Sequence, residues 1–109
     1  VINSEMPNES FITLKVGKEN KQINVNNILY VEGLKDYIKI ITTEGVLIVY
    51  ERLGKMEELV PKEDFFRIHK SFIVAKKHIS YWNTNHVAIK DREIPIGRTY
   101  KTDFLNKNK

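Results

Sequence analysis

Short alternations of apolar and polar residues dominate the first half of the chain. In the segment FITLKV, Ile12, Leu14 and Val16 fall on one face of an extended chain. The glycine and asparagine of the following GKENKQ favour a hairpin turn, and Glu44 with Gly45 indicates a second one. The segment GLKD interrupts the pattern as a loop. We therefore predict strands over residues 11–16, 23–25, 28–32, 37–43 and 46–51.

One segment follows a helical period instead. In RLGKMEELV, apolar residues recur at helical spacing, and Pro61 ends the pattern; these residues are Leu53, Met56, Leu59 and Val60. We predict a short helix there that turns all four apolar side chains toward the core, so that truncating Leu59 would leave a cavity. No other part of the chain shows a helical period as clear as this one.

The second half begins with FFRIHKSFIV, residues 65–74, which reads as a buried strand because most of its residues are apolar. Arg67 and the triplet His69, Lys70 and Ser71 interrupt it, although a buried strand gains nothing from such polar residues. We predict further strands over residues 78–82, 86–90 and 93–96, and a short helical turn in the tail, residues 98–109. The fold class that follows is mainly β with one short helix.

Composition and charge narrow the class of protein. The 109 residues correspond to one domain, and the hydrophobic fraction of 41% supports a packed core rather than disorder. The absence of cysteine excludes a disulfide scaffold and Cys-based zinc sites, and it fits a reducing compartment. No apolar run is long enough for a membrane span. The formal net charge of +4 permits a partner that carries phosphates.

The first ten residues differ in character from the rest. The opening VINSEMPNES is polar and begins with Val1 rather than Met. We interpret residues 1–10 as a linker or an expression remnant of a domain cut from a longer chain, and a processed N-terminus is the alternative. The folded domain is then expected over residues 11–109.

The residue types that catalysis needs are not grouped in the sequence. The three histidines, His69, His78 and His86, form no close helical pair, and no cysteine completes a metal site. His69 and Ser71 would share a strand face, but no Gly-x-Ser-x-Gly elbow surrounds this serine. The glycines are too scattered to form a phosphate-binding loop. We therefore predict no enzymatic activity, no metal and no cofactor.

Basic side chains occur where the β pattern breaks. A lone surface lysine is usually an ordinary solvated cation, but polar residues inside an apolar segment favour a binding role. Such side chains can donate hydrogen bonds to phosphates or to base edges. Nucleic-acid binding is therefore the favoured function, and a protein-interaction module is the alternative. The residues concerned are Lys35, His69, Lys70, Ser71, Arg98 and Lys101.

Several ordered motifs resemble the LytTR family, the DNA-binding domain of LytR/AlgR-type bacterial response regulators. The segment FFRIHKSFIV, followed by KKHI, is similar to the family's Phe-x-Arg-x-His-Arg-Ser-Tyr-x-Val-Asn signature. The segments NNILYVEGLKDYIKI, LGKMEELVPKEDF and IPIGRTYK resemble further family motifs, so the resemblance runs from about Phe11 to Tyr100. Lys70, Ala75 and Gly97 stand where the family commonly has Arg, Asn and Ser.

The resemblance implies an elongated arrangement of short antiparallel sheets with one short helix. It also implies that loops between strands, rather than a recognition helix, enter successive major grooves of duplex DNA. The His-Lys-Ser triplet would then end a buried strand and begin such a loop, with His69 contacting the DNA backbone or supporting the loop. The implied DNA-binding residues are Lys35, Asp36, Tyr37, His69, Lys70, Ser71, Arg98 and Lys101.

The resemblance also implies a biological role. The chain would be the output domain of a cytoplasmic two-component response regulator that controls transcription, and it would follow an upstream receiver domain. It would recognise paired half-sites in direct repeat. We expect the isolated domain to be a monomer in dilute solution, because the sequence shows no coiled-coil heptads. A β-rich protein- or RNA-interaction module remains the alternative function.

Overall fold

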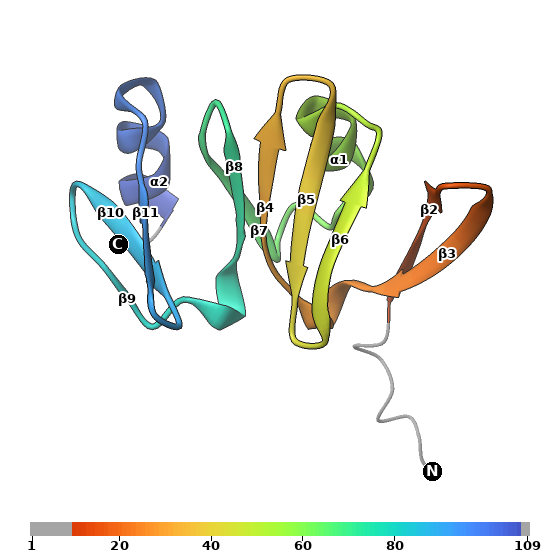
Figure 1. Ribbon diagram of the computed structural model, residues 1–109. Helices are drawn as coiled ribbons and strands as arrows, with labels where there is room; N and C mark the ends of the chain where they lie inside the picture. Colours follow the sequence, from red (N-terminus) through yellow and green to blue (C-terminus); the bar gives the residue numbers. More distant parts are fainter. Residues whose placement is uncertain (1–9, 108–109) are drawn as a thin grey trace, which may run out of the picture.

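The computed structural model describes residues 10–107, which fold into small antiparallel sheets joined by short helices (Figure 1). The predicted linker, residues 1–10, lies outside the described residues except for Ser10. The strands are β2 (Phe11–Val16), β3 (Glu19–Asn24), β4 (Ile28–Leu34), β5 (Tyr37–Thr42), β6 (Gly45–Val49), β7 (Phe65–His69), β8 (Phe72–Ala75), β9 (Tyr81–Trp82), β10 (His86–Ile89) and β11 (Arg92–Pro95). The helices are α1 (Leu53–Leu59) and α2 (Lys101–Lys107), with 3-10 helices η2 (Val25–Asn27), η3 (Lys76–His78) and η4 (Arg98–Tyr100).

The sheets stand side by side in a row. The hairpin of β2 and β3 lies at one end, and the sheet β11-β10-β9 with α2 lies at the other (Figure 1). Between them is a five-stranded sheet in the order β6-β5-β4-β8-β7. This arrangement confirms the predicted class, a mainly β fold of short antiparallel sheets. The tail, where only a helical turn was expected, adds helix α2.

In the five-stranded sheet, strand β8 and the first four residues of β4 are buried on both faces. Successive residues of a strand point to opposite faces, so Phe65 packs in one core and its neighbour Phe66 in the other. Ile73 and Val74 are divided in the same way. Burial on both faces explains why β8 is a continuous apolar run and why β7 begins with two adjacent phenylalanines. The first core lies under α1 and the β2–β3 hairpin, and the second lies under the third sheet and α2.

The segment FFRIHKSFIV is a hairpin, and the prediction of one continuous strand over residues 65–74 is wrong. Strands β7 and β8 pair antiparallel, with Phe66 opposite Val74, and Lys70 and Ser71 form the turn between them. The apolar pattern could not reveal this turn, because no Gly, Pro or Asn marks it. The outcome agrees with the resemblance, which implied that the triplet ends the strand and begins a loop.

Helix α1 forms where it was predicted, but one of its expected core residues lies outside the core. Leu53, Met56 and Val60 are buried, whereas Leu59 is 36% exposed. Positions three, four and seven apart share one helical face, and Leu59 lies at the margin of that face. The expectation that truncating Leu59 would leave a large cavity is therefore wrong.

The predicted strand over residues 78–82 is correct only at its end. Lys76–His78 form η3, and only Tyr81 and Trp82 pair with β10. The Nε2 atom of His78 lies 2.9 Å from the backbone oxygen of Asn26. This contact ties η3 to η2 across the base of the five-stranded sheet, so the segment serves as a connection between sheets rather than as a strand.

Candidate DNA interface

The β4–β5 turn presents the first group of predicted site residues. Lys35 and Asp36 form a two-residue turn, and both side chains are exposed. The backbone of Lys35 has a φ of 36°, a left-handed conformation that is unusual for a residue other than glycine. Tyr37 begins β5, half-buried, with its ring edge-on to Tyr50 at 6.1 Å between centroids. This turn therefore carries an exposed cation and an aromatic side chain two residues apart.

The β7–β8 turn lies directly beside the β4–β5 turn. The backbone N–H of Gly33, near the end of β4, donates a hydrogen bond of 2.8 Å to the carbonyl of Ser71. A shallow hollow between the two turns is lined in part by Lys35, Tyr37, Lys70 and Ser71. Four of the eight predicted residues therefore come together at one place, although more than thirty positions of sequence separate the two turns.

His69 supports the β7–β8 turn. The backbone N–H of Ser71 donates to His69 Nδ1 at 3.0 Å, and the imidazole ring lies edge-on to Phe72 at 5.5 Å between centroids. An Nδ1 atom that accepts a hydrogen bond places the ring proton on Nε2. Of the two roles expected for His69, loop support has a structural basis here, and a DNA contact stays a prediction. The pair also lacks the hydroxyl-to-imidazole contact that a serine nucleophile needs.

Arg98 reaches the same region from the C-terminal part of the fold. The N–H of Gly97 donates to the carbonyl of Ile68 at 2.7 Å, which fixes the start of η4 against the end of β7. A Cβ atom at Gly97 would lie 3.1 Å from the Tyr100 ring and 3.4 Å from His69, so glycine permits this close approach. Arg98 follows immediately and is exposed.

Lys101 differs from Lys35, Lys70 and Arg98 because its side chain is partly buried and contacts another residue. It begins α2, is partly buried, and its Nζ lies 3.4 Å from Oδ1 of Asn85 in the β9–β10 turn. The β4–β5 turn, the β7–β8 turn and the start of α2 all lie along the upper edge of the molecule in Figure 1. This edge, defined by Lys35, Lys70, Arg98 and their turns, is called the turn edge below. Lys101 lies at its margin.

Arg67 is the residue at this edge whose importance sequence reasoning missed. Its Nε donates to the carbonyl of His69 at 2.8 Å, and its Nη2 donates to the carbonyl of Lys70 at 2.7 Å. Its Nη1 lies 2.7 Å from a carboxylate oxygen of Glu57 on α1. The only signal in the sequence was a charged residue at a strand position between apolar neighbours. The signature motif includes this arginine but does not indicate what it does.

The potential metal-binding side chains of the described residues are dispersed. Between residues 10 and 107, no three His, Asp or Glu side chains gather closely enough to hold a metal ion. The three histidines are dispersed: His69 supports a turn, His78 binds a backbone oxygen, and His86 lies 3.2 Å from Glu93. No helix in that part of the chain is long and apolar enough to cross a membrane.

Comparison with known proteins gives consistent matches. Sensory transduction protein LytT of Bacillus subtilis (strain 168) is 30% identical over 99 residues, which cover 85% of this chain and 41% of that protein. LytT of Bacillus anthracis is 26% identical over 88 residues, covering 75% of this chain and 36% of that protein. The chain thus spans about two fifths of the length of these curated relatives.

A solved structure shares the fold. It is described as the LytTr DNA-binding domain of a putative methyl-accepting/DNA response regulator from Bacillus cereus. It matches with a TM-score of 0.75 at 23% identity, over 90% of this chain and 95% of that chain. The family model of the LytTr DNA-binding domain matches residues 18–109, most of the sequence. The chain therefore belongs to the LytTr DNA-binding domain family, a family of DNA-binding domains rather than enzymes.

Proposed function

We propose that this domain recognises a specific sequence in duplex DNA through the turn edge. The observation that carries the proposal is the convergence of two turns and the short helix η4, each with an exposed cation, on one edge of the molecule (Figure 1). Two backbone hydrogen bonds, from Gly33 to Ser71 and from Gly97 to Ile68, hold these elements in a fixed relation. Rigid placement matters because base readout requires donors at set positions in the groove.

Each residue has a proposed role within that edge. Lys70 and Arg98 are exposed on turns whose backbone is anchored, so we assign them to base edges, for which guanine O6 and N7 are the favoured acceptors. Lys35, Ser71 and the marginal Lys101 are assigned to phosphates, which position the domain without reading sequence. His69, Asp36 and Tyr37 complete the candidate interface as supports of the two adjacent turns.

The biological setting is part of the same proposal. We infer that the domain, residues 11–109, is the output domain of a cytoplasmic two-component response regulator and follows a receiver domain. The names of the relatives, sensory transduction proteins, and their greater length support this inference. One domain makes few base contacts, too few to select one operator from a genome, so we propose binding to paired half-sites. Their arrangement as a direct repeat is what the family resemblance implies.

Selection of bound duplexes from a random pool tests sequence recognition. Repeated rounds should enrich one short motif, and its two copies should recur in the same orientation. A gel shift at low salt should then show preference for that duplex over a scrambled duplex, single strands and RNA. Enrichment of no motif, together with equal binding to all four ligands, would contradict the proposal. Preference for RNA would instead support an RNA-interaction module.

A further inference from the structure

Arg67 connects the β7–β8 turn and η4, two parts of the turn edge, with helix α1. It lies on β7, at an irregularity in the pairing with β8, and its side chain is only 19% exposed. The guanidinium donates to the carbonyls of His69 and Lys70 at 2.8 and 2.7 Å. Two carbonyls of one turn are therefore held by one planar group, which limits how that turn can move.

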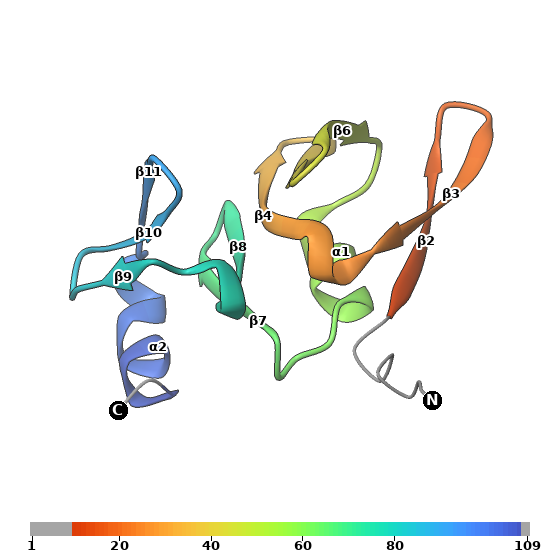
Figure 2. The ribbon, with the colours of Figure 1, turned by 90° about the horizontal axis from the view of Figure 1, so that it is seen from below.

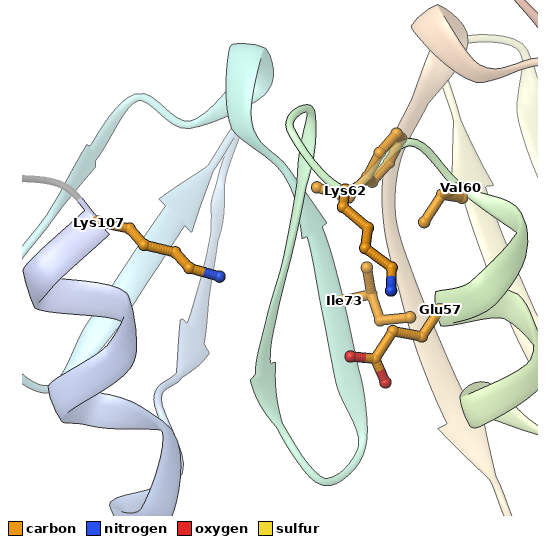
Figure 3. A pocket seen from close by; sticks show the side chains of 6 residues that line it. Glu57, Val60, Lys62, Ile73 and Lys107 are labelled. Carbon is orange, nitrogen blue, oxygen red and sulfur yellow. The ribbon is translucent and has the colours of Figure 1, made fainter.

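The other contacts of Arg67 reach elements on either side of the turn. Nη1 lies 2.7 Å from Glu57, and Figure 3 shows the Glu57 carboxylate projecting from α1 toward the β7–β8 hairpin. The guanidinium carbon lies 5.8 Å from the centroid of the Tyr100 ring in η4. Arg98, the second proposed base reader, is in that same 3-10 helix. One side chain thus contacts the Lys70 turn, the Arg98 helix and α1.

We infer that Arg67 is a positioning residue that fixes the β7–β8 turn and holds it in a constant position relative to η4. As a result, Lys70 and Arg98 would enter the same DNA groove at a constant separation. The inference rests on the proposed function of the turn edge. Arg67 would determine discrimination between DNA sequences without itself contacting DNA. Its partial burial, and the use of Nε, Nη1 and Nη2 within the protein, distinguish it from the exposed cations of that edge.

Lysine cannot replace arginine in this role. A lysine ammonium is a point charge on a flexible chain, whereas the guanidinium presents donors in a fixed fork. Arg67→Lys therefore keeps the charge and loses the two-carbonyl clamp. Arg67→Gln removes the charge as well. Glu57→Gln leaves the guanidinium in place with a weaker anchor on α1 and should give a smaller effect in the same direction.

Arg92 provides a matched control. Like Arg67 it joins separate elements, because its Nη1 lies 3.0 Å from the Tyr30 hydroxyl and 3.6 Å from the Glu32 carboxylate. It lies on β11, next to the β10–β11 turn, which points away from the turn edge (Figure 1). Arg92→Lys and Arg92→Gln therefore repeat the changes in charge and in inter-strand contacts without removing a hydrogen bond to the Lys70 turn; the Arg92 guanidinium carbon also lies 5.3 Å from the centroid of the Phe72 ring, just after that turn.

The experiment measures affinity for the selected duplex and for a scrambled duplex over a series of salt concentrations. For Arg67→Lys and Arg67→Gln we expect the ratio of specific to non-specific affinity to fall about tenfold, the loss of roughly one base readout. Non-specific affinity and the salt slope should match those of the Arg92 variants. If Arg67 contacted a phosphate directly, the salt slope of Arg67→Gln would instead be shallower than the wild-type slope by about 0.9. That result would overturn the inference.

A second measurement is independent of DNA. The Ser71 amide donates to His69 within the clamped turn, so its hydrogen exchange should be about tenfold faster in Arg67→Lys than in wild type, and unchanged in Arg92→Lys. Unchanged exchange in Arg67→Lys would refute the positioning role. If the wild type does not discriminate between the duplexes, the proposed function fails, and this exchange result still decides whether Arg67 holds the turn. If Arg67→Gln does not fold, Glu57→Gln and Arg67→Lys carry the test.

Discussion

Among the exposed cations, Lys70 and Arg98 differ from ordinary surface charges because the backbone that carries each one is anchored. The carbonyl of Lys70 is bound by Arg67, and Gly97, immediately before Arg98, is bound to Ile68. A long side chain on an anchored backbone loses less entropy on binding than one on a mobile loop. This anchoring is the physical reason to assign base readout to these two residues.

Truncation of these side chains should change recognition and leave the fold intact. Lys70→Ala and Arg98→Ala should each reduce discrimination between operator and mismatched duplexes by about 1 to 3 kcal/mol. Because both side chains are exposed, the free energy of unfolding should change by no more than about 0.5 kcal/mol. Affinity for a panel of single-base variants would show relaxed specificity at one or two base pairs. Unfolding of either variant would show that the residue is structural.

Lys35 and Lys90 form a matched pair for testing phosphate contact. Both are exposed lysines with positive φ, 36° and 53°, in two-residue hairpin turns, but only Lys35 lies on the turn edge. Asparagine tolerates this conformation, so Lys35→Asn and Lys90→Asn should fold normally and each lose one charge.

The two variants should differ in how their DNA affinity depends on salt. With three to five phosphate contacts, the wild-type domain should show a log–log salt slope of roughly −3 to −4.5. Lys35→Asn should make this slope shallower by about 0.9, and Lys90→Asn should leave it unchanged. Equal slopes for the two variants, measured by fluorescence anisotropy titration, would remove Lys35 from the interface.

At the scale of elements, α1 offers a direct test of where the first core ends. Met56 is fully buried, whereas Leu59 is 36% exposed. Met56→Ala should therefore lower the free energy of unfolding by about 2 to 5 kcal/mol through a cavity, and Leu59→Ala by less than about 1 kcal/mol. Denaturant titration of both variants measures these two losses in the free energy of unfolding. Similar losses would mean that α1 is rotated from the position described.

The sequence predicted elements best where periodicity and turn residues agreed. The strand at residues 11–16 and the hairpin at Gly45 have clear alternation next to a glycine turn, and both form as expected. The β7–β8 turn was hidden because its two arms are largely buried on both faces and no Gly, Pro or Asn marks it; Ser71 alone is a weak turn signal. Only the resemblance to a known signature indicated a loop there.

The same limit applies to the candidate site. The cations could be located at breaks of the β pattern, but their proximity could not be predicted, because it depends on the pairing of β4 with β8 and on the Gly97 contact. Arg67 was missed for a related reason. Its partners are two backbone carbonyls and Glu57 ten residues earlier, and none of these carries a sequence signal.

At the scale of the whole molecule, the row of sheets places the turn edge and the β10–β11 turn on opposite sides (Figure 1). Figure 2, seen from below, shows the three sheets following one another from the β2–β3 hairpin to α2. If the turn edge alone contacts DNA, as proposed, the spacing of a direct repeat decides whether two domains lie on the same side of the duplex.

Spacing between half-sites should therefore matter. Two domains lie on the same side of the duplex when the half-site centres are separated by close to a whole number of turns, about 10 to 10.5 bp each. Inserting roughly 5 bp, half a turn, should rotate one domain to the far side and abolish cooperativity. A shift titration of spacing variants with the full-length protein measures this. Equal affinity and stoichiometry at every spacing would leave a single independent binding module.

The most direct test of the central claim is to map the DNA-contacting surface by amide chemical shifts. Titration of the ¹⁵N-labelled domain with the selected duplex should perturb the amides of residues 35–37, 69–71 and 98–101 most strongly. The β10–β11 turn, Lys90 and Asp91, lies on the opposite side and should stay unchanged. Perturbation centred on Lys90 and Asp91, or spread evenly over all the sheets, would contradict DNA recognition by the turn edge.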